Sequence, residues 1–206
     1  MDGVLTDSEP AFFAAVNDIL ARYGKSVALD EYAGFIGSAT PAMWSAMIEL
    51  KGIPAALDEV LAAYEAPLMR RLREPRPALP GARELIEALR SRGVPIALCT
   101  ASYRRWVDAI LPSSGLGGMF DALSTADLVE ATKPDPAPYA LAAEMLGFGA
   151  RECVAIEDSV NGLTSALRAG CYVVQLGATE TAAAPQAGVG TVISSLREFP
   201  IGLVAG

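Results

Sequence analysis

From residue 82 onward, the sequence alternates helical segments with short runs of apolar residues. The apolar runs carry hydrophobic side chains at consecutive positions, which is typical of strands that are covered on both faces. Such strands alternating with helices predict an α/β fold with a Rossmann-like parallel sheet. The predicted strands are 94–99, 122–124, 153–156, 172–176 and 191–193, and the predicted helices are 82–92, 103–111, 137–146 and 160–169.

Residues 10–75 have a different pattern, in which one helix follows another without strands between them. Apolar residues recur there at helical spacing, and glycines or prolines mark the helix ends. The predicted helices cover 10–23, 40–52 and 57–72, the second with Thr40 as its N-cap. A proline-rich segment at 74–81 then breaks the helical pattern. We therefore expect a small helical part joined to a larger α/β part.

The net charge of −8 and the absence of histidine exclude several functions. A nucleic-acid partner is not expected, because binding a phosphate backbone requires a basic face. Without histidine, Ser-His-Asp and Cys-His mechanisms and His-ligated zinc are excluded, and acid–base work falls to Asp, Glu, Lys, Tyr or Cys. A small anion can still be bound locally by lysine and backbone N–H groups.

The three cysteines, Cys99, Cys153 and Cys171, lie in or beside apolar runs and match no zinc-binding spacing. We expect them to be small buried residues of a reduced, cytoplasmic protein. No apolar stretch reaches transmembrane length, and the first residues do not form a signal peptide. A membrane partner is therefore not expected.

Four short stretches carry polar side chains in a suggestive order. They are residues 1–8, 98–102, 133–136 and 156–162. Taken singly, each has an ordinary structural explanation, such as a turn, a helix N-cap, a surface kink or an acidic helix start. In parallel sheets, however, chemistry gathers at the carboxyl ends of strands, where the second and fourth stretches lie.

Together, these stretches resemble the four motifs of the haloacid dehalogenase superfamily, over essentially the whole chain. That family's first motif reads as an apolar run, Asp, any residue, then Asp-Gly, and Asp2-Gly3 matches its second half. The resemblance implies an α/β core at 1–10 and 77–206. It also implies an inserted helical cap at 11–76.

The resemblance also implies roles for individual residues. Asp2 would protonate the leaving oxygen and then deprotonate water. Lys133 would neutralise the phosphoryl group, and Thr100 with the N–H groups of Ala101 and Ser102 would bind its oxygens.

Magnesium is the implied cofactor. Glu157 and Asp158 match the family's acidic metal pair, and Asp2 is a third expected ligand. Carboxylate oxygens are the hard donors that Mg²⁺ prefers.

The family's nucleophilic aspartate and the apolar strand before it would precede Met1 in this sequence. We expect that an upstream segment supplies both, and that residues 1–206 alone have no phosphatase turnover. Asp2 is a poor substitute, because two residues after it stands Val4, which cannot move protons. A non-catalytic relative is the alternative interpretation.

The implied function is Mg²⁺-dependent hydrolysis of a small phosphate monoester, a phosphorylated metabolite such as a sugar phosphate, through an aspartyl-phosphate. Asp2 favours phosphate-ester chemistry, since dehalogenases and phosphonatases lack an aspartate there. Three alternatives remain: a receiver domain, a binding protein on this fold, and a phosphomutase of the β-phosphoglucomutase type. Residues 37–40 lack the arginine that such mutases carry. The sequence does not indicate an oligomeric state.

Overall fold

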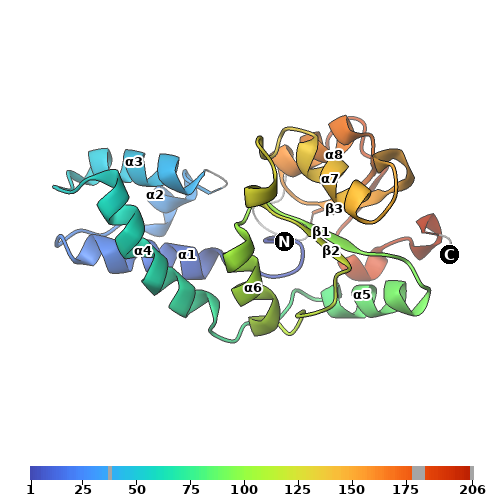
Figure 1. Cartoon of the computed structure of the whole chain (residues 1–206), viewed down its shortest axis with the longest axis horizontal. Coiled ribbons are helices and arrows are strands. Elements are labelled where there is room, and N and C mark those ends of the chain that lie inside the picture. Colours follow the sequence, from blue (N-terminus) through green and yellow to red (C-terminus); the bar gives the residue numbers. More distant parts are fainter. Residues whose placement is uncertain (37–38, 178–183, 205–206) are drawn as a thin grey trace. The chain divides into compact units, whose positions relative to one another are not determined.

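The computed structural model describes residues 1–36, 39–177 and 184–204 (Figure 1). It divides the chain into two compact units. The α/β unit consists of Met1–Asp7 and Pro75–Gly206, and the helical unit consists of Ser8–Glu74. The role of the helical unit as a cap stays a prediction.

The α/β unit contains parallel strands, as the apolar runs predicted. The strands are β1 (Ala97–Cys99), β2 (Ala122–Ser124), β3 (Val154–Glu157), β4 (Tyr172–Leu176) and β5 (Thr191–Ile193). All three pairings, β1 with β2, β3 with β4 and β4 with β5, are parallel. The predicted α/β class is confirmed.

The parallel strands of the described residues are divided between two sheets. They form a two-stranded sheet, β1–β2, and a three-stranded sheet, β3–β4–β5. The reason is that no described strand pairs with the second edge of β1 or with the second edge of β3.

Strand β1 is also shorter than the predicted strand 94–99. The Val94 N–H donates to the Leu89 carbonyl of the preceding helix, and Pro95 has no N–H to donate. The Ile96 N–H donates a hydrogen bond to the Asp121 carboxylate at 2.8 Å. The strand ladder therefore begins at Ala97.

Four helices of the α/β unit agree with their predicted ranges within two residues. They are α5 (Ala82–Ser91), α6 (Arg104–Ser113), α7 (Ala137–Met145) and α8 (Val160–Ala169). Helix α8 shows how the local sequence sets the ends: the Ser159 hydroxyl accepts from the Gly162 N–H, and Gly170 closes the helix with a left-handed φ of 95°. Short 3₁₀ turns, which the sequence did not predict, occur at Ala126–Leu128, Ala150–Glu152, Leu196–Glu198 and Ile201–Leu203.

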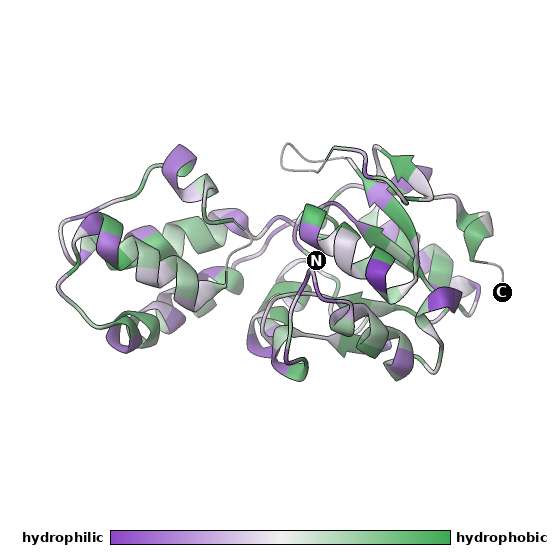
Figure 2. Cartoon of the chain, turned by 90° about the horizontal axis from the view of Figure 1, so that it is seen from above, coloured by the Kyte–Doolittle hydropathy of each residue, from purple (hydrophilic) through white to green (hydrophobic). Residues whose placement is uncertain are grey.

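Strand β4 separates two hydrophobic clusters, because its successive side chains point to opposite faces. Val174 and Leu176 pack in a cluster with residues of α5, whereas Val173 packs with residues of α7 and α8. Helix α5 therefore covers one face and α7 with α8 the other (Figure 1). Figure 2 shows hydrophobic residues, in green, on strand arrows as well as on the helices.

The helical unit packs around an aromatic pair. Trp44 and Tyr64 are fully buried, with ring centroids 5.2 Å apart and an edge-to-face angle of 71°. Arg71 and Asp18 add a two-pronged ion pair, with bonds of 2.8 and 2.9 Å, between the last and first helices. The helices are α1 (Glu9–Ala21), α2 (Leu29–Ala33), α3 (Thr40–Lys51) and α4 (Leu57–Leu72).

Two details of the helical unit differ from the prediction. Helix α2 was not predicted, because five residues are too short for a periodic pattern. Thr40 is the first residue of α3 rather than its cap; the cap is Ala39, which makes no side-chain hydrogen bond. Gly37 and Ser38, from the stretch compared with phosphomutases, lie outside the described residues.

None of the described helices combines the length and apolar character needed to cross a membrane. The three cysteines are free thiols, with Cys171 buried and Cys99 and Cys153 half-buried.

The Trp44 indole provides a test of the helical core. Its Nε1–H is buried without a hydrogen-bond partner among the described residues. Replacing Trp44 by Phe removes this unsatisfied donor and offsets part of the lost packing, so we expect a change of about 1 kcal/mol or less in the free energy of unfolding. Trp44→Ala should cost about 3–5 kcal/mol. Urea unfolding of both variants measures this, and equal losses would contradict the role given to the N–H.

Candidate active site

The predicted site residues of the second and fourth stretches lie at the carboxyl ends of β1 and β3. Thr100 directly follows β1, Glu157 is the last residue of β3, and Asp158 follows it. All three are buried, with 5–7% of their surface exposed. Buried polar groups in a sheet normally need partners, so their contacts show what the site is built to hold.

A buried ion pair between Lys133 and Glu157 links these strand ends. The Lys133 Nζ lies 2.5 Å from Glu157 Oε1 and donates to the Cys99 carbonyl at 3.1 Å. The Tyr139 hydroxyl donates to the same Glu157 oxygen at 2.6 Å, and the lysine ammonium lies 5.0 Å from the centre of the Tyr139 ring. Lys133 therefore contacts both β1 and β3.

The electrostatics keep both members of this pair charged. Burial favours the neutral form of Glu157, but the nearby Lys133 charge outweighs it and lowers the pKa of the carboxyl below its ordinary value. Burial likewise disfavours the ammonium, yet the Glu157 charge raises the pKa of Lys133. The site thus contains a permanent, desolvated positive charge.

Asp158 lies against the loop that carries Asp2. A side chain at position 3 would collide with the Asp158 carboxylate, and Gly3 also has a left-handed φ of 73°. The loop is closed on itself, because the Gly3 N–H donates to the Thr6 carbonyl and the Leu5 N–H to the Met1 carbonyl. The half-buried Asp2 is therefore brought to the same end of the unit as Asp158.

Burial and the Glu157 charge raise the pKa of Asp158 to about 6, with the terminal amino group of Met1 acting in the opposite direction. Asp158 therefore exchanges a proton near neutral pH while Glu157 stays ionised. This difference between adjacent carboxylates is characteristic of chemically active sites.

The turn after β1 contains the predicted phosphate-binding residues. The Thr100 N–H donates to the Ser124 carbonyl at 2.9 Å, and Thr100 Oγ1 accepts from the Ser102 N–H at 3.2 Å. Helix α6 begins later, with Tyr103 as its N-cap, so Ala101 and Ser102 precede its first turn. Before it could bind a phosphoryl oxygen, the Ser102 N–H would have to leave Thr100.

The three predicted magnesium ligands are not assembled into one group. Among the described residues, no cluster of three or more Asp, Glu or Cys residues could hold a metal ion. Both Glu157 oxygens accept hydrogen bonds: Oε1 accepts from Lys133 and Tyr139, and Oε2 accepts from the Ser159 hydroxyl at 3.4 Å. The adjacent carboxylates of Glu157 and Asp158 offer the hard oxygen donors that Mg²⁺ prefers, and they would hold the ion.

Two contributors to the site were not predicted. Tyr139 is an apolar position of a helical pattern in the sequence, and nothing there indicates that its hydroxyl reaches Glu157. Gly162 stands within the fourth stretch, and a Cβ at this position would collide with the Glu157 carboxylate. In the sequence, the position of Gly162 close to the Glu157–Asp158 pair was the feature that could have indicated this close approach.

This fold and cluster define a haloacid dehalogenase-like hydrolase. The family's sequence model matches residues 1–170, so the chain belongs to this family, as the motifs predicted. Hexitol phosphatase B of Escherichia coli K12 is 32% identical over 204 residues, which cover 97% of this chain and 91% of that protein.

Two solved structures extend the comparison. CbbY from Rhodobacter sphaeroides, in complex with phosphate, has a TM-score of 0.84 at 23% identity and covers 97% of this chain and 93% of that one. A HAD family hydrolase from Deinococcus radiodurans R1, with bound phosphate and sodium, has a TM-score of 0.75 at 28% identity, covering 98% and 92%. The first likeness concerns the fold alone.

The raised pKa of Asp158 predicts a pH-dependent stability. Folding favours the protonated carboxyl, so this group weakens the fold as pH rises from about 4 through the folded pKa of about 6. Asp158→Asn removes the penalty and should raise the free energy of unfolding at pH 7, without metal ions, by roughly 1–3 kcal/mol. At about pH 3.5 the gain should be small. Urea unfolding at both pH values measures it, and an equal gain at both would contradict the cause given.

The Lys133–Glu157 pair predicts strong coupling between two substitutions. Lys133→Met leaves a buried carboxylate without its counter-charge and should cost about 3–5 kcal/mol. Adding Glu157→Gln should recover part of this loss, because the unpaired charge is then removed. Chemical unfolding of the two single variants and the double variant gives the coupling free energy. Additive losses would show that the pair is not formed.

Proposed function

We propose that the site binds the phosphoryl group of a small phosphate monoester, of the sugar-phosphate class, and belongs to a Mg²⁺-dependent phosphatase mechanism with an aspartyl-phosphate. The observation that carries the proposal is the charged Lys133, whose side chain is 10% exposed and donates to the Cys99 carbonyl, directly before Thr100 at the strand end. Family membership and the name of the hexitol phosphatase relative support the substrate class.

Lys133 would supply the attraction for the phosphoryl group. A chain of net charge −8 repels anions at long range, so binding must depend on a local cation in a desolvated position. The ammonium has a raised pKa and is held between the Cys99 carbonyl and Glu157. Such a fixed charge stabilises the negative oxygens of a transferring phosphoryl group.

Thr100 and the N–H groups of Ala101 and Ser102 would orient the phosphoryl oxygens. Glu157 and Asp158 would hold Mg²⁺, which neutralises phosphate charge when bound. Asp2, on the loop against Asp158, would act as the general acid and base.

The carboxylate nucleophile is the part of the mechanism that the described site does not provide. Glu157 is committed to Lys133 and Tyr139, and Asp158 lies against Gly3. If Asp2 were the nucleophile, its general acid would be expected two residues later. Val4 stands there and cannot donate a proton. We propose that residues 1–206 alone have no turnover above background.

Two alternatives are less well supported. Residues 37–40 carry no arginine to hold the second phosphate of a phosphomutase. A non-catalytic binding protein would keep the Lys133 cluster but never gain turnover.

The three free thiols favour the proposed cytoplasmic location.

Adding a carboxylate two positions before Asp2 tests the mechanism. We expect that adding about five apolar residues followed by Asp directly before Met1 will produce Mg²⁺-dependent phosphate release, since the new carboxylate would precede Asp2 by two positions. The matched control carries the same extension ending in Asn. In the Asp form, Asp2→Ala should lower turnover by about two to four orders of magnitude.

The measurement is phosphate release from a hexitol phosphate and an aryl phosphate, with and without Mg²⁺. Equal activity of the Asp and Asn forms would show that the nucleophile lies elsewhere. Inactivity of both, with phosphate binding retained, would favour the non-catalytic alternative.

A further inference from the structure

The segment 133–139, which we call the Lys133 segment, carries two side chains that donate to Glu157 Oε1. Lys133 is its first residue and Tyr139 its last, in the first turn of α7. Between them, the Asp135 carboxylate accepts from the Ala137 N–H at 2.9 Å. This local bond shapes the segment, whereas the position of the segment in the α/β unit depends on contacts with other elements.

Helix α8 holds the first half of the Lys133 segment. Ser165 of this helix has no exposed surface, and its hydroxyl donates to the Asp135 carbonyl at 2.5 Å. Further along the helix, Arg168 donates to the Pro134 carbonyl at 3.3 Å. A buried hydroxyl that loses its partner cannot turn to water instead, so the Ser165 bond resists displacement of the segment.

Strand β2 holds the second half of the segment. Ser124 is the last residue of β2 and is 1% exposed, and its hydroxyl donates to the Pro138 carbonyl at 2.8 Å. The Ser124 carbonyl accepts from the Thr100 N–H at 2.9 Å. Ser124 is therefore bonded both to the Lys133 segment and to the turn after β1, where the predicted phosphate-binding groups lie.

The attachment of the backbone matters because lysine carries a point charge on a flexible stem. Such a stem keeps its ammonium in one place only where the ammonium has partners and the backbone is fixed, since the entropy of the stem opposes order. The partners of Lys133 are the Cys99 carbonyl and Glu157. Ser124 and Ser165 fulfil the other condition, because they fix the backbone of the segment at two points.

We propose that Ser124 and Ser165 are positioning residues for phosphate binding. They fix the Lys133 segment, so that the Lys133 ammonium is held beside the turn that carries Thr100. Both serines act through Lys133 rather than on the phosphoryl group. This role rests on the proposed function for its ligand, whereas the position of Lys133 can be measured without phosphate.

A purely structural role is the competing explanation, since the loss of any buried hydrogen bond lowers stability. Two hydroxyls that do not contact the Lys133 segment provide matched controls. Ser114 is buried, as the two serines are, and donates to the Leu111 carbonyl of α6 at 3.0 Å. Thr164 is the neighbour of Ser165 and donates to the Val160 carbonyl of its own helix at 2.8 Å.

The first experiment measures the Kd of inorganic phosphate by calorimetry, in the presence of Mg²⁺, for the 206-residue chain and four alanine variants. Ser124→Ala and Ser165→Ala should each raise Kd about threefold to tenfold, which corresponds to the usual contribution of one hydrogen bond. Ser114→Ala and Thr164→Ala should change Kd less than about twofold, because both residues lie outside the chain of bonds that ends at Lys133.

The second experiment uses no phosphate and reports on Lys133 itself. Trace acetylation with acetic anhydride, measured by mass spectrometry, gives the reactivity of the Lys133 amine, with Lys25 and Lys51 as references in the same sample. The Lys133 side chain is only 10% exposed, so we expect slow acetylation. Ser124→Ala and Ser165→Ala should accelerate it at least about threefold, because a loosened segment opens more often, and the two control variants should not.

The two measurements separate the possible outcomes. Equal acetylation of Lys133 in all four variants would overturn the proposal, even if phosphate binding weakens, because the serines would then not act through Lys133. Equal losses of phosphate affinity in site and control variants would also overturn it. Absence of phosphate binding by the unaltered chain would contradict the proposed function, and the acetylation rates would still decide whether the serines position Lys133.

Circular dichroism checks that each variant is folded. An alanine variant that is unfolded is replaced by cysteine at the same position, which keeps the volume and weakens the donor. The same acceleration of Lys133 acetylation is then expected, and an unchanged rate would count against the proposal.

Discussion

The Lys133–Glu157 ion pair connects the parts of the α/β unit that backbone hydrogen bonds leave separate. Lys133 binds the Cys99 carbonyl at the end of β1 and the Glu157 carboxylate at the end of β3. Tyr139 of α7 completes the link by donating to Glu157. The strands before Thr100 and Asp158 share no ladder, so their relative position depends on this ion pair together with the packing of Cys99 against the cluster that contains Ala155 of β3.

Much of the architecture could be predicted from the sequence, since apolar runs and helix-ending glycines act locally. Strands β2, β4 and β5 have their predicted bounds, and Gly170 closes α8 as expected of a glycine. The division into two sheets could not be predicted from periodicity. Periodicity indicates which residues form strands but not which edges meet.

The motifs predicted residues that lie near one another in the structure, but they did not predict the contacts among those residues. Thr100, Lys133, Glu157 and Asp158 do meet at the strand ends, because parallel strands place their carboxyl ends together. That Glu157 would be occupied by Lys133 and Tyr139 could not be predicted, since it depends on side-chain directions across three elements. The order of the motifs indicates which residues lie near one another. Only the folded structure shows which of these side chains bind each other.

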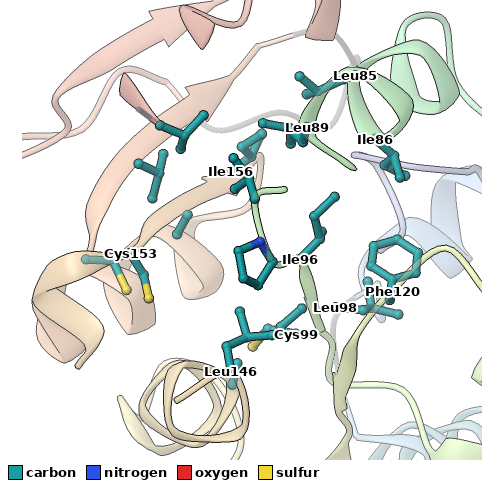
Figure 3. A pocket seen from close by; sticks show the side chains of 18 of the residues that line it. Leu85, Ile86, Leu89, Ile96, Leu98, Cys99, Phe120, Leu146, Cys153 and Ile156 are labelled. Carbon is teal, nitrogen blue, oxygen red and sulfur yellow. The ribbon is translucent and has the colours of Figure 1, made fainter. Parts of the chain in front are cut away.

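The cavity of about 500 Å³ that residues of β1 and β3 both line (Figure 3) also affects how the stability of this chain varies with temperature. The heat capacity of unfolding grows with the apolar surface that unfolding newly exposes to water. Residues such as Ile96, Val154 and Ile156 are only half-buried in the folded chain, so they contribute less to that increase. The stability curve is correspondingly flatter than for a unit with a closed sheet, and cold weakens this fold less steeply.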